Sequence, residues 1–158
     1  LSGSDEEVRG YMQKLSETGK YTVSDRVLRA VQAEFSCGFC TDAQGAQTIG
    51  RTFRENHYLL DTHTAVACTV LDAYRAGTGD QTLTVVESTA SPFKFCASVL
   101  DALGVTEHAP GTGVLGQLTA ETGRPAPGPL ASLAGKPVRF DQVTDRGDMR
   151  AVVTEFLR

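Results

Sequence analysis

An apolar run that passes directly into a hydroxyl-rich octapeptide is the feature that most constrains how this chain folds. The run is Leu83–Val86, and the octapeptide Ser88–Phe95 has the sequence Ser-Thr-Ala-Ser-Pro-Phe-Lys-Phe. A β-branched apolar run predicts a buried strand, and Pro92 suits the first turn of a helix after it. Because ligands of α/β proteins bind at the carboxyl ends of strands, the hydroxyls of Ser88 and Thr89 are candidate ligand contacts.

A second segment rich in polar side chains, Asp61–Val66, precedes the octapeptide and has the sequence Asp-Thr-His-Thr-Ala-Val. Asp61 and Thr64 are suited to fix a turn and to cap the helix that follows. His63 is the best candidate for a general acid or base by residue type, because histidine titrates near neutral pH. A simple hydrogen-bonding role at a helix start is the alternative for His63.

Together, the two segments resemble threonine synthase, a family of enzymes that use pyridoxal 5′-phosphate (PLP). Bacterial and fungal members carry Asp-Pro-His-Thr-Ala-Val, then a helix, then a strand that ends in Ser-Thr-Ala-Ser-Pro-(Tyr or Phe)-Lys-Phe. This chain departs visibly at Thr62, where the family usually has proline. Tyr11–Tyr21 and Gly135–Phe140 are also similar to family segments, so the resemblance extends over essentially all 158 residues.

The resemblance implies an α/β fold class, with this chain as a helix-rich C-terminal segment. The parent fold would be the layered parallel sheet of tryptophan-synthase-β-like, fold-type II PLP enzymes. We expect residues 1–57 to form a helical subdomain. We expect residues 58–158 to be the C-terminal part of the PLP-enzyme α/β domain, ending in a loop-rich wrap and a terminal helix.

Helix signals are dense in the N-terminal third of the chain. Ser4 with Glu7, and Thr41 with Gln44, have the spacing of capping boxes. Ser24 is a further N-cap candidate between them. These signals predict three helices joined by short polar turns.

The rest of the chain mixes helical and extended patterns. Ala65–Tyr74 is apolar almost all round, which is typical of a helix buried on more than one side. Val138–Phe140 predicts a short strand, and Met149–Leu157 predicts a final helix with one apolar face. We expect that face to dock against other parts of the protein.

The resemblance also implies roles for single residues. The family's threonine in this motif is the hydrogen-bond partner of the PLP pyridine nitrogen, which implies a cofactor-binding role for Thr89. A helix cap is the alternative for Thr89, and Ser88 is the neighbouring candidate. Lys94 is a candidate for attracting the substrate phosphate, with an ion pair as its alternative. The same resemblance makes His63 a residue that lines the site.

The activity implied for the full-length parent is the conversion of O-phospho-L-homoserine and water to L-threonine and phosphate, with PLP as cofactor. The family's Schiff-base lysine and its cofactor-phosphate loop lie in the N-terminal part, and neither is found here. We therefore expect a C-terminal fragment that is inactive alone and that partners with the N-terminal part of the same polypeptide. The alternatives are a stand-alone, non-catalytic interaction or ligand-binding module, and a related carbon–oxygen lyase.

Charge and hydropathy exclude some partners. A formal net charge of −4 provides no basic footprint for nucleic acid or for an anionic membrane surface. No apolar run approaches the roughly 20 residues that span a bilayer.

The four cysteines are a weak metal or redox signal. Cys37 and Cys40 have CxxC spacing, but Cys68 and Cys96 do not supply a second pair. We expect no metal site, and we expect thiols packed as small apolar groups. Unpaired cysteines suit a reducing compartment, which predicts a cytoplasmic location.

Overall fold

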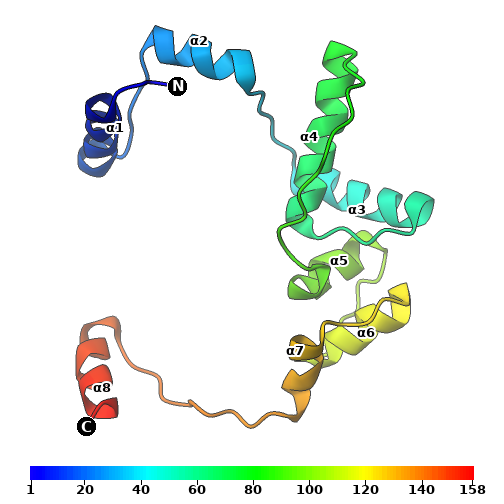
Figure 1. Ribbon diagram of the computed structural model, residues 1–158. Helices are drawn as coiled ribbons and strands as arrows, with labels where there is room; N and C mark the ends of the chain where they lie inside the picture. Colours follow the sequence, from blue (N-terminus) through cyan, green and yellow to red (C-terminus); the bar gives the residue numbers. More distant parts are fainter.

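A computed structural model describes all 158 residues as helices joined by extended segments and turns. The helices are α1 Asp5–Thr18, α2 Asp25–Glu34, α3 Asp42–Asn56, α4 Thr62–Thr78, α5 Cys96–Ala102, α6 Gly113–Thr122, α7 Gly128–Ala131 and α8 Met149–Phe156. Short 3-10 turns are η1 Pro92–Lys94, η2 Ser132–Gly135 and η3 Arg146–Asp148. The chain follows an open arc, with α1 and α2 at one end and α8 at the other (Figure 1).

The predicted helix caps at α2 and α3 are confirmed. The Ser24 hydroxyl accepts a hydrogen bond from the Val27 N–H at the start of α2. Thr41 and Gln44 form a complete capping box at α3, in which each side chain accepts from the other residue's backbone N–H. These contacts satisfy backbone donors that the first turn of a helix leaves free.

The predicted capping box at α1 is only half formed. The Ser4 hydroxyl accepts from the Glu7 N–H at 3.1 Å. The Glu7 carboxylate accepts instead from the Tyr11 hydroxyl at 2.6 Å and from Arg26 at 2.9 Å. Arg26 belongs to α2, so the carboxylate that local spacing assigns to a cap ties two helices together.

The core lies where α3, α4, α5 and α6 meet. Its buried apolar side chains are Ile49, Leu60, Ala65, Phe93, Cys96, Val99, Leu100 and Leu118. The hydroxyls of Thr48 and Thr69 lie 2.8 Å apart where α3 packs on α4. Because α3 packs on α4 and α5, contacts cross residue 57, and the proposed division at that position stays a prediction about the parent protein.

The structure contains no β-strand, so the strands predicted at Leu83–Val86 and Val138–Phe140 are wrong for this chain. Leu83 and Val85 are 92% and 86% exposed. Residues 80–90 make no backbone–backbone hydrogen bond. A strand requires a neighbour that completes its ladder of hydrogen bonds, and this chain supplies none.

The central apolar helix is mostly exposed within this chain, so its burial on more than one side stays a prediction about the parent protein. Only Thr64 and Ala65, in the first turn of α4, are buried, and Val66 is 41% exposed. The final helix α8 is present as predicted, but its Val153 and Phe156 are exposed. Its docking therefore stays a prediction.

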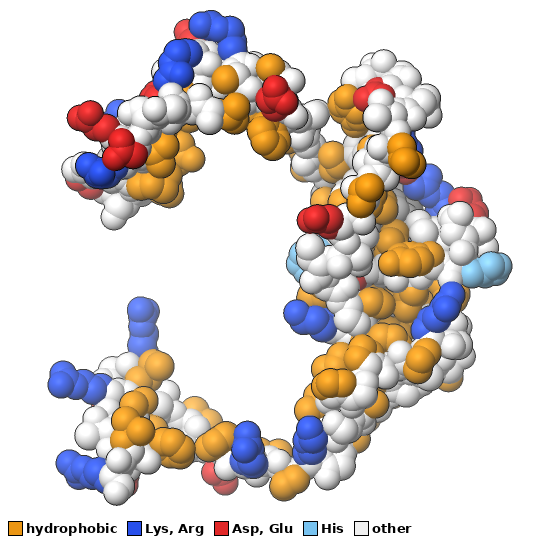
Figure 2. Space-filling view, viewed as in Figure 1, with side chains coloured by type: hydrophobic (Ala, Val, Ile, Leu, Met, Phe, Trp, Pro, Cys, Tyr) orange, Lys and Arg blue, Asp and Glu red, His pale blue; other side chains and the backbone are white.

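The chain exposes far more surface than a compact protein of its mass. Its accessible surface is 12,033 Å², whereas a folded monomer of this mass exposes about 7,700 Å². Figure 2 shows hydrophobic side chains gathered on the inner side of α1 and α2. None of the helices combines the length and apolar character that a membrane crossing requires.

Candidate functional site

Asp61 organises the start of α4. As the N-cap, its carboxylate accepts from the backbone N–H of His63 at 2.8 Å and of Thr64 at 3.3 Å. It also accepts a short hydrogen bond from the Thr64 hydroxyl. The predicted capping role of Asp61 is confirmed, and the side chain is fully buried.

Ser88 connects the octapeptide to this cap. Its hydroxyl oxygen lies 3.1 Å from the hydroxyl oxygen of Thr64 and donates a longer hydrogen bond of 3.4 Å to the Asp61 carboxylate. The two segments singled out in the sequence therefore meet in space. Sequence spacing could not reveal this contact, because 27 residues separate Asp61 from Ser88.

The hydrogen bonds decide the charge of Asp61. Burial by itself raises the pKa of this carboxyl, because an apolar environment disfavours the charged form. The hydrogen bonds from Thr64, from the His63 N–H and from Ser88 outweigh burial, so the pKa lies below its usual value. The carboxylate is therefore ionised at neutral pH and acts only as an acceptor.

His63 and Lys94 both lie near the ring of Phe95. The His63 ring is largely exposed, its centroid lies 5.0 Å from that of Phe95, and its Nδ1 lies 3.4 Å from an Asp61 oxygen. The Lys94 Nζ lies 5.9 Å from the centroid of the Phe95 ring. Lys94 makes no ion pair within the chain, so its alternative role in an ion pair is not confirmed here.

Thr89 is exposed, and its hydroxyl makes no hydrogen bond within the chain. It is not a helix cap, because the N-cap of η1 is Ser91, whose hydroxyl accepts from the Phe93 N–H at 3.3 Å. Thr89 follows an exposed extended segment instead of the buried strand that we expected. Its hydroxyl is available to a ligand or to another part of the protein.

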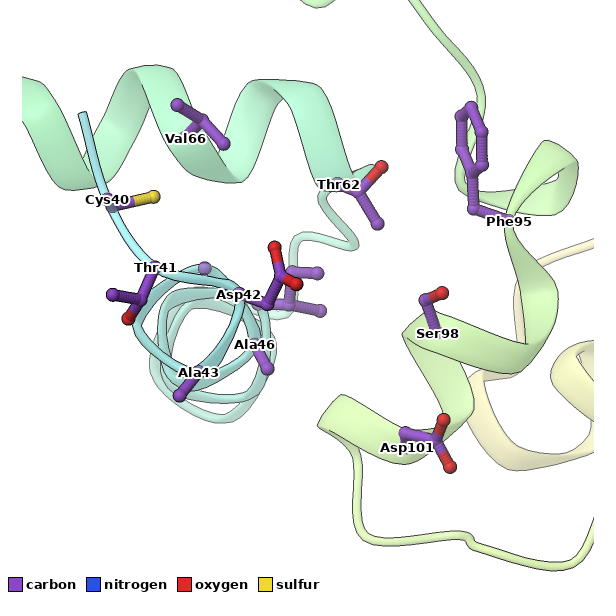
Figure 3. A pocket seen from close by; sticks show the side chains of 12 residues that line it. Cys40, Thr41, Asp42, Ala43, Ala46, Thr62, Val66, Phe95, Ser98 and Asp101 are labelled. Atoms are coloured by element: carbon purple, nitrogen blue, oxygen red, sulfur yellow. The ribbon is translucent and has the colours of Figure 1, made fainter.

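A cleft of about 580 Å³ opens beside this junction, between the start of α3, α4 and α5. Asp42, Thr62 and Ser98 point into the space between these helices, with Phe95 at its edge (Figure 3). Sequence reasoning missed Asp42 and Ser98, since each belongs to a different helix and to no motif.

The cysteines form no recognisable site. All four are free; Cys37 is exposed and Cys96 is buried. The structure contains no group of three or more His, Cys, Asp or Glu side chains that could hold a metal ion.

Comparison with known proteins places these motifs in a family. The model of the family "Threonine synthase, C-terminal" matches residues 64–154, more than half of the chain. The chain belongs to the threonine synthase C-terminal family. The match covers the octapeptide with Ser88, Thr89 and Lys94, and it begins at Thr64.

Curated relatives that match this chain are much longer than it is. Threonine synthase of Saccharomyces cerevisiae is 28% identical over 101 residues, which cover 61% of this chain and 20% of the yeast protein. Threonine synthase-like 1 of Mus musculus is 33% identical over 82 residues, which cover 51% of this chain and 10% of the mouse protein. The chain thus spans a tenth to a fifth of the length of these relatives.

Solved threonine synthases share the fold. The structure of yeast threonine synthase matches 97% of this chain and 29% of its own, with a TM-score of 0.73 at 22% identity. PLP-bound threonine synthase from Brucella melitensis is 34% identical and matches 75% of this chain and 24% of its own, with a TM-score of 0.55. The helical arc in Figure 1 therefore resembles a part of much longer chains.

Proposed function

We propose that this chain is the C-terminal part of a PLP-dependent threonine synthase. The full-length protein would act as a lyase that converts O-phospho-L-homoserine and water to L-threonine and phosphate. The observation that carries the proposal is the family match over residues 64–154, which includes the whole octapeptide. The 34% identity to a PLP-bound threonine synthase supports the same cofactor.

The residues present fit a role at the pyridine ring of PLP. When bound, PLP withdraws electrons from the substrate carbons next to its reactive centre. A ring nitrogen needs a donor, and the Thr89 hydroxyl has its proton free. The Ser88 hydroxyl is engaged by Asp61 and Thr64, which favours Thr89 over Ser88 as the donor. A hydroxyl is too weak an acid to protonate the nitrogen, so it would hold the ring by a neutral hydrogen bond.

His63 and Lys94 are proposed to line the substrate side of the site. Both lie near the Phe95 ring, and the Lys94 ammonium has no carboxylate partner in the chain. An unpaired ammonium attracts phosphate as a point charge. Neither side chain is proposed as the lysine that carries the cofactor, which would lie in the N-terminal part.

The N-terminal part of the same polypeptide is the proposed partner of the exposed surface. The chain exposes several thousand Å² more than a compact monomer of its mass. A layered parallel sheet in the N-terminal part would pair with the extended segment that contains Leu83 and Val85. We propose that the division into residues 1–57 and 58–158 describes the parent, and that the parent is cytoplasmic.

The test is turnover by the full-length protein. O-phosphohomoserine would be supplied with PLP, and phosphate and threonine would be measured together. We expect equal amounts of both products, and strong loss of turnover in Thr89→Ala. Thr84→Ala is the matched control, since Thr84 lies in the same exposed segment but its hydroxyl contacts Arg75. Absence of threonine, or unchanged turnover in Thr89→Ala, would overturn the proposal.

A further inference from the structure

The hydroxyl of Ser88 attaches the loop that carries Thr89 to the rest of the chain. Between Thr84 and Ser91, the hydrogen bonds of the Ser88 hydroxyl are the only ones that the chain makes. Neither a helix nor a strand holds this stretch. The position of Thr89 therefore depends on the residue immediately before it.

The other side of this contact is buried and held by several hydrogen bonds. Asp61 is fully buried, and it is held by two backbone N–H groups and by the Thr64 hydroxyl. Ala65, in the same turn, belongs to the hydrophobic core. A side chain fixed in this way can hold a loop that has few contacts of its own.

The hydrogen bonds at this junction fix where the hydroxyl protons of Thr64 and Ser88 point. A hydroxyl has one proton to donate, and the Thr64 proton goes to the Asp61 carboxylate. The Ser88 hydroxyl donates its proton to the Asp61 carboxylate at 3.4 Å, while its oxygen lies 3.1 Å from that of Thr64. This bond directs the Ser88 proton toward Asp61 and away from a ligand.

We infer that Asp61 is a positioning residue that holds Thr89 in place through Ser88. The inference rests on the proposed contact between Thr89 and the PLP ring, and it adds a residue that does not itself touch the cofactor. Three of the four groups that donate to the buried Asp61 carboxylate lie at the start of α4. The inference gives a role to the fourth, the hydroxyl of Ser88.

The test uses the full-length protein without cofactor, titrated with PLP and followed by absorbance. Ser88→Ala removes the contact and leaves the helix cap intact, so folding is preserved. We expect Ser88→Ala to weaken PLP binding roughly 3- to 10-fold, the effect of one hydrogen bond. Ser88→Thr, which keeps the hydroxyl, should recover most of the affinity, and Thr84→Ala should match the unmodified protein.

The double variant distinguishes positioning from general damage. If Ser88 acts by placing Thr89, Ser88→Ala should have little further effect in a Thr89→Ala background. Full additivity of the two losses, or no loss in Ser88→Ala, would overturn the inference. If Thr89→Ala binds PLP normally, the proposed function fails instead, and the two failures are thus separate.

Asp61→Asn supplies a second measurement, because it replaces a charged acceptor by an amide of the same shape. We expect the PLP affinity to fall at least as far as in Ser88→Ala, and the double variant with Ser88→Ala to fall no further. An Asp61→Asn protein that is folded at the assay temperature and binds PLP with unchanged affinity would also overturn the inference.

Discussion

Gly50 of α3 packs directly against the main chain of Ala102 at the end of α5. A Cβ at Gly50 would lie 2.6 Å from the Ala102 carbonyl oxygen, closer than real contacts allow. Gly50 is buried, and the neighbouring Ile49 belongs to the core. The absence of a side chain at Gly50 therefore sets the distance between these two helices.

Gly50→Ala should lower the stability of the full-length protein by about 1–3 kcal/mol, because backbone must move to admit the methyl group. Gly77→Ala is the matched control, as Gly77 lies in α4 with open space around its Cβ position. That change should stabilise slightly, by about 0.5–1 kcal/mol. Thermal melts of both variants test the prediction, and equal melting temperatures would contradict it.

Asp61 should make stability depend on pH. Its pKa is lowered in the folded protein, so its contribution is complete above the unfolded value of about 3.9 and is lost as pH falls through the folded value. Asp61→Asn should cost about 1–3 kcal/mol at pH 7 through the lost cap and unmatched donors. The loss of stability in Asp61→Asn, relative to the unmodified protein, should become smaller at acidic pH.

Urea unfolding at pH 7 and below pH 4 measures this difference. Asp141→Asn is the control, because Asp141 is exposed and makes no hydrogen bond; it should change stability at neither pH. A deficit for Asp61→Asn that is the same at both pH values would show that the charge is irrelevant.

The local features of the fold followed from the sequence, whereas the contacts between segments did not. Caps at Ser24, Thr41 and Asp61 depend on residues within three positions, so spacing is enough to predict them. The contact between Asp61 and Ser88 depends on how α4 and the loop are placed by the core. The strand at Leu83–Val86 was wrong because pairing requires a partner that this chain does not contain.

Contacts between segments also explain why the sequence did not predict the role of Glu7 or the residues of the cleft. Glu7 has the spacing of a capping residue, but its carboxylate accepts a hydrogen bond from Arg26 of α2 and does not complete the cap. Asp42 and Ser98 meet at the cleft only because α3 and α5 pack together. No local pattern distinguishes these residues from other polar residues on helices.

The four thiols should differ in their rates of alkylation. Burial raises the pKa of Cys96 and of Cys68, and the thiolate is the reactive form. Cys37 is exposed, so it should react first with iodoacetamide, and Cys96 should react last. Peptide mapping over time tests the order, and the four rates should converge in denaturant. Fast labelling of Cys96 in the native protein would contradict the described core.

The chain separated from the rest of the protein should self-associate. Leu83 and Val85 are almost fully exposed, and Val66 and Tyr74 of α4 are partly exposed. An unpaired extended segment with apolar side chains is a template for pairing with another copy. Light scattering should show oligomers.

Lysine substitutions at Leu83 and Val85 together should reduce that association, because charge on an edge opposes pairing. Leu133→Lys is the control, at an exposed leucine in η2 away from this segment. A monomeric, protease-resistant chain that binds no hydrophobic dye would instead favour a stand-alone module.

The central claim is that this chain contributes the hydroxyl partner of PLP, while the lysine that holds the cofactor lies elsewhere in the polypeptide. Borohydride reduction of the full-length protein with PLP, followed by peptide mapping, tests it directly. We predict one stoichiometric adduct on a lysine outside these 158 residues, and no specific adduct when the chain is treated alone. A stoichiometric adduct on Lys94, or on any other lysine of this chain, would contradict the account.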